Sequence, residues 1–191
     1  MKTAASILVA LSLALAGCAS ARPAGPAVPS TPLVTPTGVT LDARELVAGA
    51  KLTVLVFFSP DCHCLDQHDA RLRELAAAYR PHGVQLVMVD SEVHATPEAD
   101  SAQAAQRGYR FPILVDHGAR LADAVGAQYA TYSVIVDAQG HVLYRGGIDS
   151  DKTHLRATST QYLRDALDDL LAGKQPRVAD AKTLGCSLQK W

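Results

Sequence analysis

The sequence predicts an α/β domain with a mainly parallel central sheet, a C-terminal antiparallel hairpin and helices on both faces. Two apolar, β-branched runs, 52–58 and 84–90, are separated by a segment with helical periodicity, as in a parallel strand–helix–strand unit. Two further strand-like runs, 133–137 and 141–144, flank Ala138-Gln139-Gly140, whose glycine is typical of a hairpin turn.

The helices are predicted from apolar stripes and stop signals. A helix over 63–80 carries a stripe at helical spacing and ends at Pro81-His82-Gly83. The stripe consists of Leu65, Leu72, Leu75, Ala76 and Tyr79. Further helices are expected at 41–48, 97–107, 116–124 and 161–171, with a short strand at 111–115. This order of elements is that of the thioredoxin fold.

The N-terminal region is predicted to be a leader followed by a tether. Lys2 and the apolar run after it have the form of a secretory signal, and Leu15-Ala16-Gly17-Cys18 resembles the lipobox of bacterial lipoproteins. The resemblance implies removal of residues 1–17, a lipid on Cys18 and, with Ala19 following, the outer membrane facing the periplasm. The alternative is an ordinary secreted protein, cut near Ala19 or Ala21.

Composition divides the remainder of the chain. Residues 18–40 are rich in proline and small residues and are expected to form an extended tether to a domain over 41–175. A cysteine-containing tail, 176–191, follows. With 18 Lys and Arg against 19 Asp and Glu, and without a basic stripe, the chain is not expected to bind nucleic acid.

Cys62-His63-Cys64 is the main candidate site. It opens the helix predicted over 63–80, where the positive end of the helix dipole favours thiolate over thiol. Positions i and i+2 of a helix point about 200° apart, so a Cys62–Cys64 disulfide requires an unwound first turn. Such a bond is strained, and strain makes a disulfide easier to reduce.

If Cys18 carries a lipid, three thiols remain, and Cys186 is the one outside the Cys62-His63-Cys64 motif. Two interpretations of Cys186 stay open: a resolving thiol that pairs with Cys62 or Cys64 during turnover, or one half of a permanent structural disulfide that holds the tail against the site. His68 lies four residues after Cys64 and could act as its base or as a metal ligand. We favour instead a half-buried histidine whose ring is satisfied by the backbone.

Three segments carry a resemblance to a known family. The run 54–64, the hairpin 134–142 and Tyr144-Arg145-Gly146-Gly147-Ile148-Asp149 resemble redoxin-domain proteins of the thioredoxin-like superfamily, which includes alkyl hydroperoxide reductases and thiol-specific antioxidants. The C-terminal Gly185-Cys186-Ser187-Leu188 resembles a subgroup of them. The resemblance implies that Cys62 attacks and that Cys64 or Cys186 resolves.

The sequence departs from the family pattern at three positions. Leu65 stands where thioredoxins have a second cysteine, and Cys64 where peroxiredoxins have a threonine. Thr131 replaces the usual cis-proline, beside Tyr132 in the loop that would face a substrate. A cis bond before a residue other than proline costs about 3–4 kcal/mol, so we expect a trans peptide at Thr131.

These observations predict a lipid-anchored thiol–disulfide oxidoreductase of the cell envelope, without a cofactor, that exchanges with a protein or small thiol or disulfide. One alternative is a thiol peroxidase that passes through a sulfenic acid. Another is a copper-binding module similar to Sco-type chaperones. Those use a distant histidine near position 130, where this chain has Tyr-Ala-Thr-Tyr, which leaves His117 as the nearest substitute. We assign no metal ligand. The fourth interpretation is a redox-inert scaffold.

Overall fold

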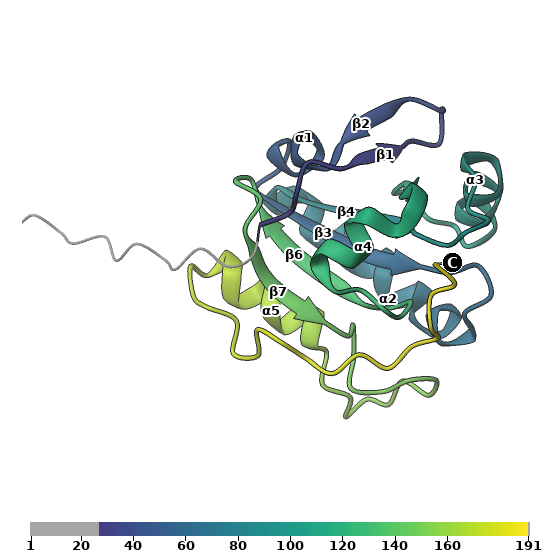
Figure 1. Ribbon diagram of the computed structural model, residues 1–191. Helices are drawn as coiled ribbons and strands as arrows, with labels where there is room; N and C mark the ends of the chain where they lie inside the picture. The colour runs from purple at the N-terminus through teal and green to yellow at the C-terminus, as the bar shows by residue number, and fades with distance from the viewer. Residues whose placement is uncertain (1–26, 191) are drawn as a thin grey trace, which may run out of the picture.

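The computed structural model describes residues 27–190 (Figure 1). The predicted leader, the lipid site at Cys18 and the first part of the tether lie outside this range. The strands are β1 (Pro32–Val34), β2 (Thr40–Asp42), β3 (Leu52–Phe58), β4 (Val84–Asp90), β5 (Ile113–Val115), β6 (Ser133–Asp137) and β7 (Val142–Gly146). The α-helices are α1 (Ala43–Ala48), α2 (His63–Tyr79), α3 (Pro97–Gln106), α4 (Arg120–Val125) and α5 (Tyr162–Leu171), and short 3-10 turns η1 (Arg80–His82) and η2 (His117–Ala119) accompany α2 and α4.

The seven strands form one mixed sheet in the order β2-β1-β5-β4-β3-β6-β7. Only β3 with β4 and β4 with β5 pair in parallel, whereas the other four pairings are antiparallel. The prediction of a mainly parallel sheet was therefore wrong. The short connection between β1 and β2 permits only antiparallel pairing, and β6–β7 is the predicted hairpin. All seven residues of β3 are buried, as expected for the central strand.

The predicted tether is wrong for residues 27–40. Val28 and Leu33 are fully buried in the core, and the Val28 N–H donates to the Gly140 carbonyl at 2.8 Å. Two buried aliphatic side chains and paired backbone groups outweigh the proline content here. Pro32 is tolerated because it is the first residue of β1, where a missing N–H does least harm. The domain thus begins before residue 41.

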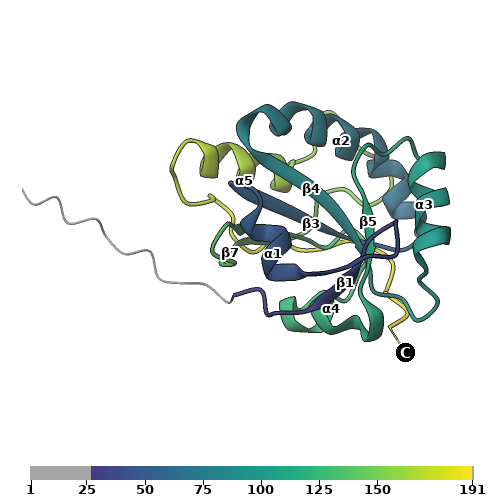
Figure 2. The same ribbon diagram turned by 90° about the horizontal axis from the view of Figure 1, so that it is seen from above.

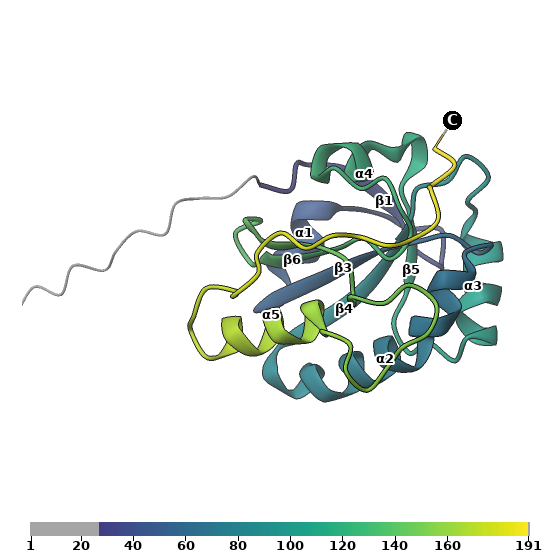
Figure 3. The ribbon, with the colours of Figure 1, turned by 90° about the horizontal axis from the view of Figure 1, so that it is seen from below.

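The helices lie on both faces of the sheet, as predicted. Figures 2 and 3 show α2 and α5 on one face and α4 on the other. The α2 stripe packs on the sheet as expected, with Leu65, Leu72, Leu75 and Tyr79 buried. Among residues 27–190, no helix is long and apolar enough to cross a membrane.

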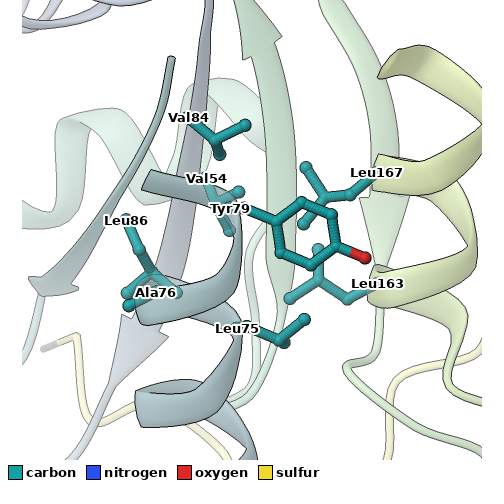
Figure 4. Close-up of a pocket in the computed structure, with 8 residues that line it drawn as sticks. All are labelled: Val54, Leu75, Ala76, Tyr79, Val84, Leu86, Leu163 and Leu167. Atoms are coloured by element: carbon teal, nitrogen blue, oxygen red, sulfur yellow. The ribbon is translucent and has the colours of Figure 1, made fainter. Parts of the chain in front are cut away.

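Packing between α2, α5 and the sheet is nearly complete. The cavity at this junction has a volume of about 10 Å³ and is lined almost entirely by aliphatic side chains (Figure 4). A space of that size holds at most a single water molecule, and a water needs polar partners. The junction is therefore core, and it fixes α2 so that its first turn stands where β3 ends.

The C-terminal tail, residues 176–190, runs back along β7 toward the start of α2 (Figure 3). It pairs with the edge strand, since the Arg145 N–H donates to Ala179 O and the Ala181 N–H donates to Arg145 O, both at 3.0 Å. A Cβ at Gly146 would stand 2.2 Å from the Ala181 carbonyl oxygen. Only glycine lets the tail approach β7 this closely.

Candidate functional site

The three predicted thiols, Cys62, Cys64 and Cys186, come together at the start of α2. Their Sγ atoms all lie within 4.8 Å of one another, although Cys186 is 124 residues from Cys62. The Cys186 Sγ is 2.8 Å from Cys62 Sγ and 3.7 Å from Cys64 Sγ. All three are free thiols. The site is thus a cluster of three sulfurs rather than a pair.

The conformation of Cys62 is what allows this cluster. Cys62 is the N-cap of α2 with φ −86° and ψ 97°, an extended conformation, whereas Cys64 lies in the first helical turn. The Cys62 N–H donates to the Ser59 carbonyl at 3.3 Å, which bends the chain directly after β3. Because Cys62 is not helical, its side chain and that of Cys64 are not forced to opposite sides, and both are buried.

Backbone hydrogen bonds hold Cys186 against the loop that precedes β6. The Ala130 N–H donates to Cys186 O at 2.9 Å, and the Leu188 N–H donates to Gln128 O at 3.0 Å. Residue 185 is glycine because a Cβ there would stand 1.9 Å from the Ala130 carbonyl oxygen. The tail therefore pairs with 128–130 as a short antiparallel bridge.

The end of the tail is held by the loop after β4 and by α4. The Val93 N–H donates to Gln189 O at 2.8 Å, and the Gln189 N–H donates to Glu92 Oε1 at 3.2 Å. Lys190 Nζ lies 2.6 Å from Asp123 Oδ1 on α4. Cys186 thus lies between two anchored segments, which places its sulfur with little freedom.

Thr131 and Tyr132, the predicted substrate loop, lie behind the tail. Thr131 is buried, has φ +74° and is reached by a trans peptide, as expected. Its N–H donates to Phe57 O at 3.0 Å, and its Oγ1 donates to Leu184 O at 3.3 Å. The tail thus contacts this loop directly, and contact between the loop and a substrate stays a prediction.

The buried ring of His68 contacts the backbone of the first turn of α2. Its Nδ1 lies 2.7 Å from Cys64 O, and its Nε2 lies 3.6 Å from Asp149 Oδ2, which in turn pairs with Arg71. The expected satisfaction by the backbone is confirmed, although the ring is fully buried rather than half-buried. Asp149 and Arg71 were not predicted to matter; the only signal was the place of Asp149 in a segment that resembles redoxins.

Electrostatics separate Cys186 from the two thiols of α2. Burial, together with the hydrogen bond to Cys186, raises the pKa of Cys62 to about 12. Burial likewise raises the pKa of Cys64. For Cys186, burial acts in the same direction, but the hydrogen bonds from Cys62 and from the Cys64 backbone outweigh it and lower the pKa. The thiolate is therefore favoured on the tail.

The fold and the cysteine cluster define a thioredoxin-like α/β protein with its thiols at the start of the helix that follows the central strand. The chain belongs to the Redoxin family, which matches residues 23–162. A curated relative, the thiol-disulfide oxidoreductase ResA of Halalkalibacterium halodurans, is 25% identical over 114 residues, or 58% of this chain and 62% of the relative. The match thus spans less than two thirds of that relative's length.

Solved structures agree on the fold. An uncharacterized conserved protein from Geobacillus kaustophilus has a TM-score of 0.78 at 28% identity, and the alignment covers 90% of this chain and 94% of that protein's chain. A secreted disulfide oxidoreductase from Mycobacterium tuberculosis has a TM-score of 0.50 at 21% identity, covering 59% and 80%. The first of these covers both the domain and nearly all of the other chain.

Proposed function

We propose that the protein is a thiol–disulfide oxidoreductase whose redox-active disulfide joins Cys62 and Cys186. The observation that carries the proposal is the 2.8 Å separation of their sulfurs, with Cys62 in an extended conformation. Cys64 stands next to Cys186 at 3.7 Å as a second, internal partner. Thiol–disulfide exchange at these sulfurs needs no cofactor.

Cys186 is the sulfur that meets the partner. It is the one thiol of the cluster that is not buried, and its pKa is lowered. Its thiolate attacks the partner disulfide and forms a mixed disulfide, and one partner sulfur leaves as a thiolate. Cys62 then loses its proton and attacks Cys186 Sγ, which releases the second partner thiol. These roles reverse the sequence expectation that Cys62 attacks first.

The sequence and the names of the relatives support our proposal for the partner and the location. ResA is named a thiol-disulfide oxidoreductase, and the Mycobacterium tuberculosis structure is that of a secreted disulfide oxidoreductase. With the lipobox resemblance at Cys18, these names support a lipid-anchored protein of the cell envelope, facing the periplasm and exchanging with protein or small thiols. A thiol peroxidase that uses Cys62 or Cys64 as the peroxidatic thiol is less well supported, because a peroxidatic thiolate requires a low pKa and burial raises the pKa of both.

Disulfide mapping tests the pairing. The oxidised full chain is alkylated, digested and analysed by mass spectrometry, beside the variants C62S, C64S and C186S and the matched control C18S. We expect a Cys62–Cys186 disulfide that persists in C64S and C18S. A dominant Cys62–Cys64 disulfide, or three thiols that stay free under a disulfide oxidant, would contradict the proposal.

A further inference from the structure

The cluster holds one more sulfur than disulfide exchange requires. We propose that the reduced protein also binds a single soft monovalent cation, Cu(I), through the Sγ atoms of Cys62, Cys64 and Cys186. This is a second property of the same residues, independent of the proposed exchange with a partner. The three sulfurs come from two distant parts of the chain, the start of α2 and the C-terminal tail.

The spacing of the sulfurs fits one metal ion. Three sulfurs each about 2.3 Å from a central metal stand about 4 Å apart. Here all three Sγ atoms lie within 4.8 Å, and Cys186 Sγ is 2.8 Å from Cys62 Sγ and 3.7 Å from Cys64 Sγ. Only the Cys62–Cys186 contact has to widen, by about 1 Å.

The donor set selects the kind of metal. Among residues 27–190, this trio is the only cluster of potential ligands, and no histidine or carboxylate belongs to it. His68 is occupied, because its Nδ1 faces Cys64 O and its Nε2 faces Asp149. Structural zinc takes four ligands, whereas soft thiolates without a fourth donor suit Cu(I). Cys62 and Cys64 are both buried, so no water reaches the cluster from the side of α2.

The missing third ligand of the copper interpretation is therefore a cysteine. The sequence left His117 as the nearest substitute, but this residue is exposed in η2 and lies outside the cluster. Cys186 takes the third position instead, because the tail folds back across 128–130. Only the tertiary structure could place it there.

Backbone amides face the sulfurs that would carry charge. The N–H groups of Leu65 and Cys186 point to Cys62 Sγ, and the N–H of Cys64 points to Cys186 Sγ. Binding replaces three S–H bonds by three bonds from sulfur to the metal and releases three protons to the buffer, so the complex carries a charge of −2. Amide donors and the positive end of the α2 dipole offset that charge.

The test is competition for Cu(I). The reduced full chain is titrated without oxygen against a chromogenic Cu(I) chelator, and sulfur coordination is read by X-ray absorption. We expect one Cu(I) per chain in a shell of three sulfurs. Each of C62S, C64S and C186S should weaken binding by about 100-fold or more, since loss of a group that merely orients a ligand already costs 10–100-fold. The matched variants C18S and H117A should bind as the parent does.

The outcomes separate the two proposals. Copper binding that survives C186S at parental affinity, or a metal shell containing nitrogen, would overturn the three-sulfur site. So would a chain that leaves all of the copper on the chelator. Circular dichroism of each variant before titration ensures that a loss is not unfolding. Because the disulfide is mapped on oxidised protein without metal, the Cys62–Cys186 pairing can fail while copper binding holds, and the reverse.

Discussion

The start of α2 and the C-terminal tail both supply sulfur to the site, but they are held in opposite ways. Cys62 and Cys64 follow a fully buried strand and begin a helix whose stripe packs in the core. Cys186 lies in a segment without helix, fixed by backbone hydrogen bonds to 128–130 and to the loop after β4. Each such bond is worth about 0.5–1.5 kcal/mol net. One part of the site is thus set in the core, and we expect the other to open at a lower free-energy cost than unfolding of the domain.

This difference supports the proposal that the tail carries the sulfur that meets the partner. Cys62 and Cys64 are buried and shielded from a protein partner, whereas the partly exposed Cys186 would meet the partner first and then pair with Cys62. Burial raises the pKa of Cys62 and Cys64, whereas the Cys62 thiol and the Cys64 backbone N–H, by donating hydrogen bonds, lower that of Cys186. In the proposed mechanism, the start of α2 therefore helps to activate Cys186.

The largest expected effect is on exchange activity. Full-chain C62S and C186S should each reduce a model protein disulfide at least about 100-fold more slowly, because each removes a sulfur of the active pair. C64S should lose much less, since it only borders the pair. Rates are measured with a fluorescent disulfide substrate, with C18S as control. Equal losses in C64S and C186S would mean that the tail is not the exchanging segment.

The next effect compares the stability of the two regions. Leu65→Ala removes a fully buried side chain of α2 and should lower the free energy of unfolding by about 2–5 kcal/mol. Leu188→Ala removes a buried side chain of the tail, where the neighbours can relax, and should cost about 1–2 kcal/mol. Urea unfolding measures both, with the exposed Val178→Ala expected within about 0.5 kcal/mol of the parent. A cost at Leu188 as large as at Leu65 would make the tail part of the core.

A third prediction loosens the tail alone. Gly185→Ala places a Cβ against the Ala130 carbonyl oxygen, so the tail must shift, at a cost of about 1–3 kcal/mol. Alkylation of Cys186 should become faster, while that of Cys62 stays slow. Mass spectrometry of timed alkylation follows each thiol, and the exposed Ser187→Ala serves as control. Unchanged alkylation of Cys186 would show that Gly185 is not what seats the tail.

The sequence predicted most of the fold because periodicity is local. The strand 52–58, the helix 63–80 and the hairpin around Gly140 are confirmed with nearly their expected bounds. The N-terminal strands β1 and β2 were missed, since a proline-rich segment with two buried aliphatics differs little from a linker until its partners are known. The same limit made the sheet look mainly parallel.

The site was predicted residue by residue but not as an arrangement. Cysteine spacing and the helix start identified Cys62 and Cys64, and the odd thiol count identified Cys186. That the tail crosses 128–130 depends on contacts more than 50 residues apart in sequence, and that Cys62 is extended depends on the turn from Ser59 that precedes α2. The roles of Arg71 and Asp149 behind His68 likewise carry no local signal.

The smallest expected effect is a pH dependence near the loop that holds the tail. Asp90 ends β4 beside Phe58, and its Oδ1 accepts the Glu92 N–H at 2.8 Å, which shapes that loop. Asp90 also shares a hydrogen bond with Asp100, and both carboxyls are buried. Burial, followed by the charge of Asp90, raises the pKa of Asp100 to about 8, and burial raises that of Asp90 to about 6.

Both pKa values lie above those of unfolded carboxyls, so the folded protein keeps protons that the unfolded chain loses. The contribution of this pair to the free energy of unfolding is fully present below about pH 4 and is lost as the pH rises through about 6 and 8. The loss is at most about 1.4 kcal/mol per pH unit for each proton. Asp100→Asn keeps a donor toward Asp90 and removes one titrating proton. Urea unfolding from pH 5 to 9 should therefore give a flatter profile than the parent, whereas the exposed Glu98→Gln should leave the slope unchanged. Parallel profiles for the parent and Asp100→Asn would mean that this pair does not set the slope and that the anchor of the tail does not respond to pH.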